Sequence, residues 1–163
     1  MAAASLIATA LGIVLLLLTA YFLAGGALGA IGVVSDAQKD MTSVQVKMLG
    51  TSASVLNSKS GDSLLFFESM NDGREPIRDM EAIDVYLNDQ TIGWTRFTYS
   101  HTPGTGHWTK VKITAGDYTA EKIYTGQWDP GEILNISVTY SDIAPNYFKI
   151  VTPNGVGALY PVS

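Results

Sequence analysis

Two histidines are the side chains of this sequence that are best suited to acid–base or metal chemistry near neutral pH. His101 and His107 flank the segment TPGTG, and a turn in that segment would bring both imidazole rings to one hairpin tip. A metal site needs further ligands, and the nearest carboxylate in the sequence belongs to Asp117. We therefore expect a solvated loop rather than a metal centre. The alternative is a membrane-tethered binding or enzymatic domain that uses these histidines.

Acidic side chains form two further groups that could supply carboxylates. The first group alternates with apolar residues: Asp79, Glu81 and Asp84. That alternation is more typical of an exposed strand face than of a paired general acid and base. The second group offers oxygen ligands for a hard cation, although its spacing does not match a calcium loop: Asp62, Glu68 and Asp72. These patterns predict a protein with no catalytic residue, no metal and no cofactor.

Three tryptophans and one glycosylation sequon are the remaining candidates. Tryptophan rings can stack on sugars, but in a β protein they belong more often to the core: Trp94, Trp108 and Trp128. Asn135 begins Asn-Ile-Ser, the one N-x-S/T sequon of the chain. If the chain is exported, Asn135 is the predicted N-glycosylation site, and its side chain should then point outward.

The elements that must position these side chains have the pattern of short strands between turns. Val, Ile, Thr and Tyr are frequent there, and turn signals such as Asn71-Asp72-Gly73 and Asp129-Pro130-Gly131 recur at short intervals. About eight segments have this character: residues 44–48, 63–70, 82–87, 93–100, 107–114, 118–125, 133–141 and 146–152. Their spacing predicts one antiparallel β-sandwich or barrel.

Composition excludes several classes of function. The chain of 163 residues has a net charge of −5 and no basic cluster, so it lacks the positive patch with which proteins bind nucleic-acid phosphates. It has no cysteine, which excludes disulfides and thiolate metal sites. About 128 residues follow the apolar N-terminal segment, which is the size of one domain.

The N-terminal segment is uncharged up to Asp36 and mostly apolar. No basic residue precedes the apolar run, and the run is too long for a cleaved secretory signal. As a helix, the 29 residues from Leu6 to Val34 would measure roughly 43 Å, more than the ~30 Å hydrocarbon core of a bilayer. Beyond Val34 we expect the helix to continue for one or two turns and to stop near Ser43, where the strand pattern of residues 44–48 begins.

Two roles fit such a helix: a single membrane anchor, or a core element packed among copies of itself. Its second half is rich in Ala and Gly, and Gly25 and Gly29 have the small-xxx-small spacing that lets helix backbones approach closely. This spacing favours helix–helix packing over a lone anchor. The predicted packing interface combines these glycines with bulky residues: Leu11, Leu15, Leu18, Phe22, Gly25 and Gly29.

A charge-poor N-terminal helix joined to an acidic, cysteine-free β domain resembles the type IV pilin-like proteins of archaea. Three segments are similar to archaellum (archaeal flagellum) components, namely the filament archaellins and the accessory proteins F and G: AIDVYLNDQTIGW, WDPGEILNISVTY and FKIVTPNGV. The chain departs from bacterial-type pilins, which carry a glutamate near the mature N-terminus where this sequence has Ser5. A basic leader is also missing, so either the numbering begins after processing or the protein is an unprocessed, anchored relative.

The resemblance implies an α+β fold, with a hydrophobic helix over residues 1–41 and an extracellular, Ig-like antiparallel sandwich over residues 42–163. It implies a structural filament subunit for swimming and adhesion rather than an enzyme. The subunit would lie in the cytoplasmic membrane before assembly and then pack with copies of itself in a helical cell-surface filament. The alternatives are a membrane-anchored accessory protein that binds the surface layer, and an adhesion pilin. Other filament subunits are further expected partners.

Overall fold

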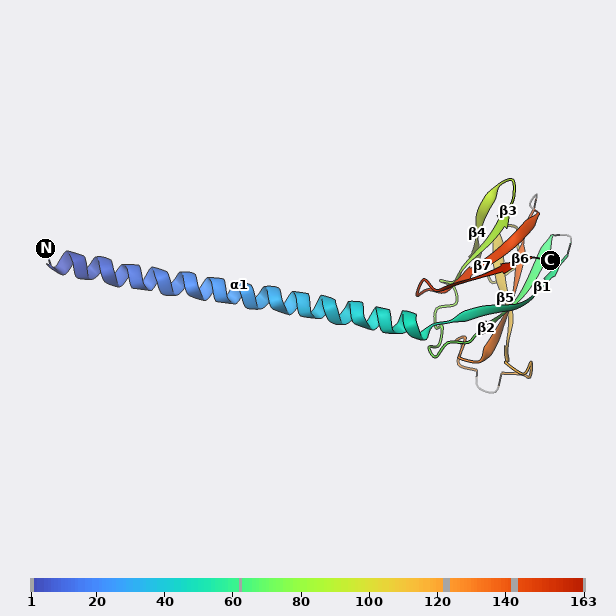
Figure 1. Ribbon diagram of the computed structural model, residues 1–163, viewed down its shortest axis with the longest axis horizontal. Helices are drawn as coiled ribbons and strands as arrows, with labels where there is room; N and C mark the ends of the chain where they lie inside the picture. The colour runs from blue at the N-terminus through green and yellow to red at the C-terminus, as the bar shows by residue number, and fades with distance from the viewer. Residues whose placement is uncertain (1, 62, 122–123, 142–143, 163) are drawn as a thin grey trace. The chain divides into compact units, whose positions relative to one another are not determined.

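The computed structural model describes residues 2–61, 63–121, 124–141 and 144–162. The chain divides into two compact units, Met1–Ser43 and Val44–Ser163. One long helix, α1 (Ala2–Gly50), precedes the eight β-strands of the described residues (Figure 1). The last turns of α1, from Val44 onward, belong to the same compact unit as the strands.

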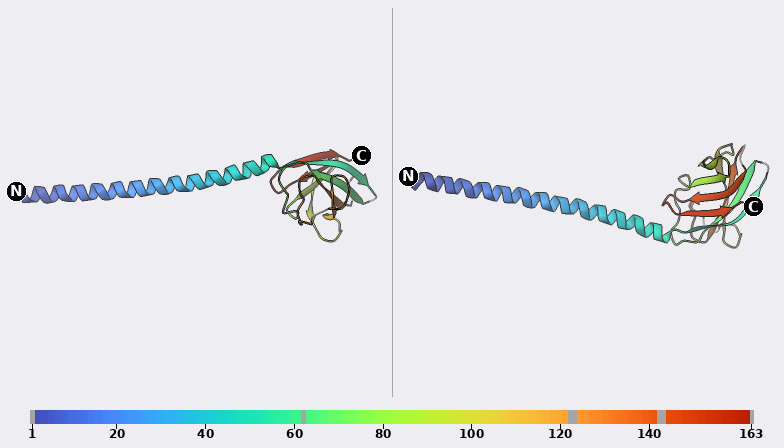
Figure 2. Two further views of the ribbon diagram at one scale, coloured as in Figure 1. Left: turned by 90° about the horizontal axis from the view of Figure 1, so that it is seen from below. Right: turned by 45° about the horizontal axis from the view of Figure 1, so that its top comes forward.

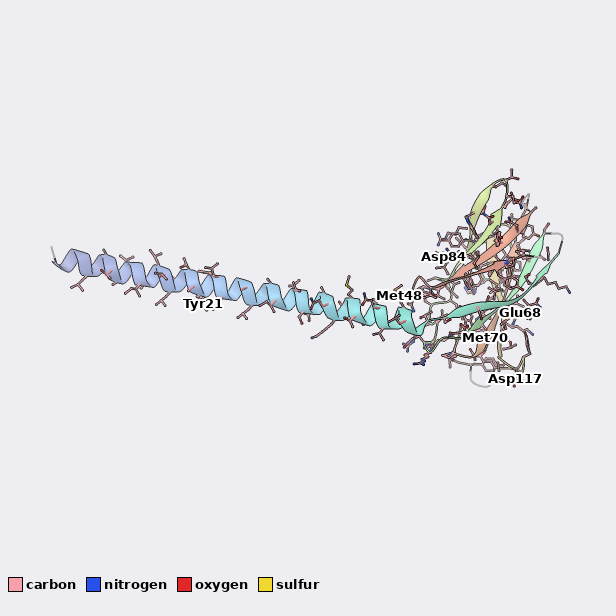
Figure 3. All side chains as sticks on the ribbon, viewed as in Figure 1. Tyr21, Met48, Glu68, Met70, Asp84 and Asp117 are labelled. Atoms are coloured by element: carbon pink, nitrogen blue, oxygen red, sulfur yellow. The ribbon has the colours of Figure 1, made fainter. Side chains whose placement is uncertain are left out.

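Helix α1 contains no proline, and its most frequent residues are Ala and Leu, which are strong helix formers. Every side chain from Leu6 to Leu49 is exposed, and Figure 3 shows side chains projecting from α1 on all sides. The hydroxyl of Thr19 donates to the main-chain oxygens of Leu15 and Leu16, at 3.0 and 2.9 Å. Its polar group is therefore satisfied within the helix. A helix that is apolar around its whole circumference needs burial in protein or lipid.

The strand predicted over residues 44–48 is wrong, because α1 continues through them to Gly50. Five alternating residues fit a helix as well as a strand, and extending an existing helix adds one hydrogen bond per residue without a new nucleation step. After Gly50 the main-chain N of Thr51 donates to Met48 O at 3.2 Å. The hydroxyl of Thr51 donates to Lys47 O at 2.7 Å, which satisfies one of the last carbonyl groups of the helix.

The strands follow one another in a single hydrogen-bonded order. Their bounds are β1 (Ala53–Ser60), β2 (Leu64–Asn71), β3 (Asp84–Asp89), β4 (Gly93–Tyr99), β5 (His107–Ala115), β6 (Glu132–Thr139), β7 (Pro145–Val151) and β8 (Gly157–Pro161). The spatial order is β1-β2-β6-β5-β4-β3-β7-β8. These pairs are antiparallel except β4 with β5, which are parallel over two residue pairs. Strands β1 and β8 also contact each other, so the sheet nearly closes on itself.

The strands form two layers with an immunoglobulin-like arrangement. One layer holds β1-β2-β6-β5 and the other holds β4-β3-β7-β8, which correspond to the orders A-B-E-D and C′-C-F-G of immunoglobulin domains. Figure 2 shows β7 and β8 as neighbouring red arrows that run in opposite directions. The predicted α+β fold, a long apolar helix followed by an antiparallel β-sandwich, is confirmed.

The sequence pattern misses β1 and β8 and wrongly predicts a strand over residues 118–125. Strand β1 (ASVLNSKS) is mostly polar, and β8 (GALYP) has Gly and Pro at its ends, so neither resembles a half-buried strand. In the segment 118–125, Tyr118 has a positive φ of 63°, and Asp117 Oδ1 accepts a hydrogen bond from Thr119 N at 3.0 Å. These features make a turn, and the described part of the segment pairs only through an isolated bridge between Ala120 and Thr114.

The hydrophobic core lies between the two layers. One layer contributes Leu65, Phe67, Trp108, Leu134, Ile136 and Val138, and the other contributes Val85, Leu87, Phe97, Phe148 and Ile150. The rings of Phe67 and Phe148 stack with their centroids 3.4 Å apart and their planes at 19°. Because Phe67 lies on β2 and Phe148 on β7, this contact joins the layers at the centre of the sandwich.

Candidate functional site

The helix interface predicted from the sequence lies on one stripe of α1. Its six members recur at spacings of four and three residues, which places them on one face of a helix: Leu11, Leu15, Leu18, Phe22, Gly25 and Gly29. The four bulky members are between 48% and 71% exposed. Apart from the helix backbone, no atom lies within 4 Å of the place that a Cβ would take at Gly25 or Gly29. This face is open to a partner, and its role in assembly stays a prediction.

A second feature holds the C-terminal end of α1 against the loop that follows β2. The carbonyl oxygen of Gly50 accepts hydrogen bonds from Arg74 N at 2.6 Å and from Glu75 N at 3.2 Å. The carbonyl oxygen of Ser52 accepts one from Gly73 N at 3.1 Å. The last carbonyls of a helix have no partner within it, so the loop satisfies them. We call this arrangement the helix-end clamp, made of Gly50, Thr51, Ser52, Asn71, Gly73, Arg74, Glu75, Trp128 and Asn154.

Gly73 lies at the closest approach within the helix-end clamp. A Cβ added to it would lie 2.5 Å from Ser52 N and 2.6 Å from Gly50 O. Both are main-chain atoms, which cannot move aside as the end of a flexible side chain can. Glycine is therefore the residue that fits here while the clamp keeps its hydrogen bonds.

Asn71 is the buried centre of the clamp, with 0% of its surface exposed. Its Nδ2 donates to Trp128 O at 2.9 Å and to Glu75 O at 3.0 Å. Its Oδ1 accepts from Gly73 N at 3.1 Å, and its main-chain oxygen accepts from Gly131 N at 2.7 Å. One amide side chain thus fixes two loops beside the end of the helix, since buried amide groups are stable only with their hydrogen bonds made.

A third loop, between β7 and β8, reaches the same place. Nδ2 of Asn154 donates to the hydroxyl of Thr51 at 2.9 Å. The segments NDG and WDPGE, which the sequence predicts as turns, and TPNG, which belongs to one of the archaellum-like segments, therefore meet at the end of α1. Sequence reasoning missed this role, because the Asn and Gly residues of each turn are equally consistent with an isolated turn.

The two histidines have separate partners. Nδ1 of His107 lies 3.0 Å from the Thr98 hydroxyl. Nδ1 of His101 lies 3.1 Å from the Tyr99 hydroxyl, and its Nε2 lies 3.7 Å from Glu81 Oε1. Both rings are on the surface. Within the described ranges, no three His, Cys, Asp or Glu side chains are placed to hold a metal ion.

The first group of acidic residues is also divided among different contacts. Asp84 Oδ1 lies 2.6 Å from Nη2 and 2.8 Å from Nε of Arg96. This hydrogen-bonded ion pair raises the pKa of Arg96 above its usual range. Asp79 Oδ1 accepts a hydrogen bond from Ala82 N at 3.2 Å, which stabilises a turn. These two contacts are structural, and the third member, Glu81, is the residue that lies beside His101.

Two members of the second acidic group, Glu68 and Asp72, lie in the part of the chain that the structure describes. Asp62 lies outside the described residues, Glu68 lies on β2, and Asp72 lies in the loop of the helix-end clamp. Oε2 of Glu68 accepts a hydrogen bond from the Tyr118 hydroxyl at 3.5 Å. Asp117 lies in the loop after β5, where its carboxylate binds Thr119.

Two of the three tryptophans are core residues, whereas Asn135 lies in the middle of the sheet. Trp108 and Trp128 are fully buried, and Trp94 on β4 is 50% exposed. Asn135 lies on β6 between β2 and β5, and its Nδ2, the atom that would carry a glycan, exposes less than 1 Å². Glycosylation of Asn135 stays a prediction.

Comparison with known proteins identifies similar solved structures, whereas no family model and no curated protein sequence matches the chain. The archaellum periplasmic stator protein FlaG from Sulfolobus acidocaldarius matches with a TM-score of 0.51 and 19% identity, over 69% of this chain and 99% of that one. In the FlaF and FlaG stator complex of the same organism, a chain matches with a TM-score of 0.51 and 17% identity, over 68% of this chain and 87% of its own length. The archaeal flagellum of Methanospirillum hungatei strain JF1 matches with a TM-score of 0.59 and 17% identity, over 94% of this chain and 90% of that one.

The flagellum match extends through the helix. Helix α1 holds 49 of the 163 residues, so a match over 94% of the chain includes most of α1. The three matched structures are archaellum components, which agrees with the resemblance of the sequence motifs, and identities of 17–19% establish likeness of fold. This chain therefore shares its fold with solved components of the archaellum.

Proposed function

We propose that this chain is a structural subunit of an archaellum filament and that it assembles through α1. The observation that carries the proposal is the surface of α1, which is apolar on every side from Leu6 to Val34 and exposed in the single chain. Such a surface requires lipid or other protein around it. The flagellum match, which includes most of α1, supports burial among neighbouring copies.

The assembly step takes α1 from the membrane into the core of the filament. By length and composition, the segment Leu6–Gly50 can cross a membrane, and we place it in the cytoplasmic membrane before assembly. Exposing apolar surface to water costs about 25 cal/mol per Å², so α1 leaves the membrane only when neighbours cover it at the same time. Lipid and protein cover apolar groups equally well, so close packing at Gly25 and Gly29 supplies the preference for the filament.

The helix-end clamp fits the mechanical demand on a filament used for swimming. A load on α1 must pass to the β domain on the cell exterior, and it enters through Gly50, Thr51 and Ser52. Their hydrogen bonds to Gly73, Arg74, Glu75 and Asn154 resist separation. We infer that the clamp makes the last turn of α1 and the β domain respond to load as one body.

The second candidate function is a membrane-anchored accessory protein of the archaellum. The match to the stator protein FlaG, which covers 99% of that chain, favours it. In this role α1 stays in the membrane, and the β domain binds the surface layer or another archaellum protein as a static anchor. An adhesion pilin would use the same helix and domain for attachment.

Composition and abundance of surface appendages test the proposal. Filaments are sheared from cells, viewed by negative-stain microscopy and quantified by mass spectrometry beside the membrane fraction. We expect this chain to be a main protein of the filaments and among the most abundant surface proteins. A scarce chain that remains in the membrane fraction would indicate the accessory role, and its absence from purified filaments would refute the filament role.

A further inference from the structure

The polar end of α1 carries an apolar stripe that the proposed interface does not include. Nine of the 14 residues from Ser35 to Met48 are polar or charged. Four of the five apolar ones recur at spacings of four, three and four residues, and we call them the juxtamembrane stripe: Ala37, Met41, Val44 and Met48. The three larger side chains are 67%, 55% and 41% exposed, in that order. Figure 3 labels Met48 near the end of the helix.

The fifth apolar residue, Val46, faces another direction. It lies two residues from Val44, which is about 200° around a helix. Val46 and Leu49 line a hollow together with residues 72–75 of the clamp loop. These two side chains are 58% and 88% exposed, so the hollow is open, and they lie on a different side of the helix from Val44 and Met48.

The juxtamembrane stripe continues a pattern that runs through nearly all of α1. The same alternation of three and four residues extends back through Leu6, Thr9, Ile13, Leu16, Ala20, Leu23, Ala27, Ala30 and Val34. These are the a and d positions of successive heptads, the pattern of a coiled-coil seam. Between Leu6 and Val34 most residues are apolar at every position of the heptad. The heptad pattern therefore distinguishes one face of α1 from the others only after Val34.

The predicted interface stripe behaves differently beyond the apolar segment. It is displaced from the heptad seam by two residues, or about 200°, and its next members are Asp36, Lys39 and Ser43. Lipid solvates apolar side chains, whereas water does not. Of these two faces of α1, the juxtamembrane stripe is therefore the one that still needs an apolar cover outside the membrane.

We infer that the juxtamembrane stripe binds the same stripe of a second copy, so that two chains form a parallel two-stranded coiled coil at the membrane surface before filament assembly. The inference rests on the part of the proposed function that places α1 in a membrane. Copies in one membrane have the same orientation and depth, because the apolar run ends at Val34 in each of them. Their stripes then lie at the same height and in register.

The charges of this segment allow self-association. Between residues 35 and 48 there are two acidic and two basic side chains: Asp36, Lys39, Asp40 and Lys47. The segment is neutral, so a second copy brings no net repulsion. The seam positions themselves are uncharged, as two identical helices require when they pack knobs into holes.

Disulfide formation tests the pairing cleanly, because the chain has no cysteine of its own. Met41→Cys and Val44→Cys are made singly in the full chain, which is expressed in bacterial membranes that contain no archaellum proteins. Ser43→Cys and Lys39→Cys are the matched controls, since both lie on the opposite stripe. Membranes are treated with copper phenanthroline and separated on non-reducing gels. A disulfide requires Cβ atoms about 3.5–4.5 Å apart, so it reports close approach.

We expect Met41→Cys and Val44→Cys to yield several-fold more covalent dimer than either control. Introducing Met41→Lys should lower the dimer formed through Val44→Cys to the level of the controls. Equal yields at all four positions, or dimers through the controls alone, would overturn the inference. The outcome for the filament proposal is separate. If the chain forms these dimers but is absent from filaments, only the filament role is refuted. If the chain builds filaments but does not form these dimers, only the pairing is refuted.

Discussion

Gly73 has no side chain, which allows the loop after β2 to lie close to the end of α1. An added Cβ would meet the main chain at Ser52 N and Gly50 O, 2.5 and 2.6 Å away. We expect Gly73→Ala to lower the free energy of unfolding by about 1–3 kcal/mol, the usual cost of overpacking. Urea unfolding of the full chain in detergent measures it. Gly104→Ala is the matched control, because its Cβ would make an ordinary 3.6 Å contact, and equal stability of the two variants would contradict the close approach.

Asp89 makes the stability of the β domain depend on pH. Its carboxylate accepts hydrogen bonds from the main-chain N atoms of Ala144, Thr91 and Ile92, at 2.7, 2.6 and 3.1 Å. These donors, led by Ala144, hold the pKa of Asp89 below its usual range. A group with a lowered folded-state pKa adds stability above its unfolded-state pKa and loses it as pH falls through the folded-state pKa.

We therefore expect the unfolding free energy of the natural chain to decline as the pH falls below about 4, the ordinary value for an aspartate, and Asp89 is protonated. In Asp89→Asn this part of the decline should be missing, because the amide does not titrate. The measurement is the urea midpoint at several pH values. Parallel acid profiles for the two proteins would show that the Asp89 hydrogen bonds do not favour the ionised form.

At the scale of elements, the face of α1 that contains Gly25 and Gly29 is the predicted contact with neighbouring helices. If the stripe that contains Gly25 and Gly29 packs against neighbouring helices, a bulky residue there must push backbones apart. We predict that Gly25→Leu and Gly29→Leu each leave membrane insertion intact but abolish or shorten filaments. Gly26→Leu is the matched control, because it adds the same side chain outside the stripe, about 100° from Gly25 and about 60° from Gly29 around the helix.

Filament length, swimming and abundance in the membrane fraction are compared among these glycine variants. Normal filaments from both Gly25→Leu and Gly29→Leu would show that this face is not an assembly interface. The plain membrane anchor would then become the better description of α1.

The contact between the two sheet layers depends on a pair of stacked rings. Phe148 is fully buried against Phe67, with the ring centroids 3.4 Å apart. We expect Phe148→Ala to cost about 3–5 kcal/mol, since it removes a core ring and leaves a cavity. Tyr147→Ala changes the neighbouring residue, which is 42% exposed, and should cost less than about 0.5 kcal/mol by chemical denaturation. Similar losses for the two variants would place the core elsewhere.

At the scale of the whole molecule, the two compact units have different requirements for solubility. The unit Val44–Ser163 contains the sandwich and the helix-end clamp, so we expect it to fold as a monomer without detergent. The complete chain should need lipid or detergent, because α1 exposes its apolar surface. Size-exclusion chromatography with light scattering tests both, and aggregation of Val44–Ser163 would show that its fold needs the rest of α1. The same fragment should take up no metal and bind no glycan if it is not a binding domain.

The sequence by itself determined the elements that depend on local pattern. The apolar body of α1 follows from a long run without a charge, and six of the predicted strand segments coincide with β2 to β7, because alternation and turn residues mark them. The pattern was wrong for residues 44–48 and 118–125. It also missed β1 and β8, whose polar or Gly- and Pro-containing sequences are stabilised by pairing with β2 and β7 rather than by their own burial pattern.

Only the tertiary structure decided where α1 ends and what holds it there. The helix-end clamp joins Thr51 to Asn154 and Asn71 to Trp128, pairs that are 103 and 57 residues apart in the chain. The NDG and WDPGE segments show in the sequence that the chain turns at each of them, and the TPNG segment lies between β7 and β8. Their meeting point is set by the order in which the strands pair, because hydrogen bonds between distant segments form only when the fold brings their donors and acceptors within about 3 Å of each other.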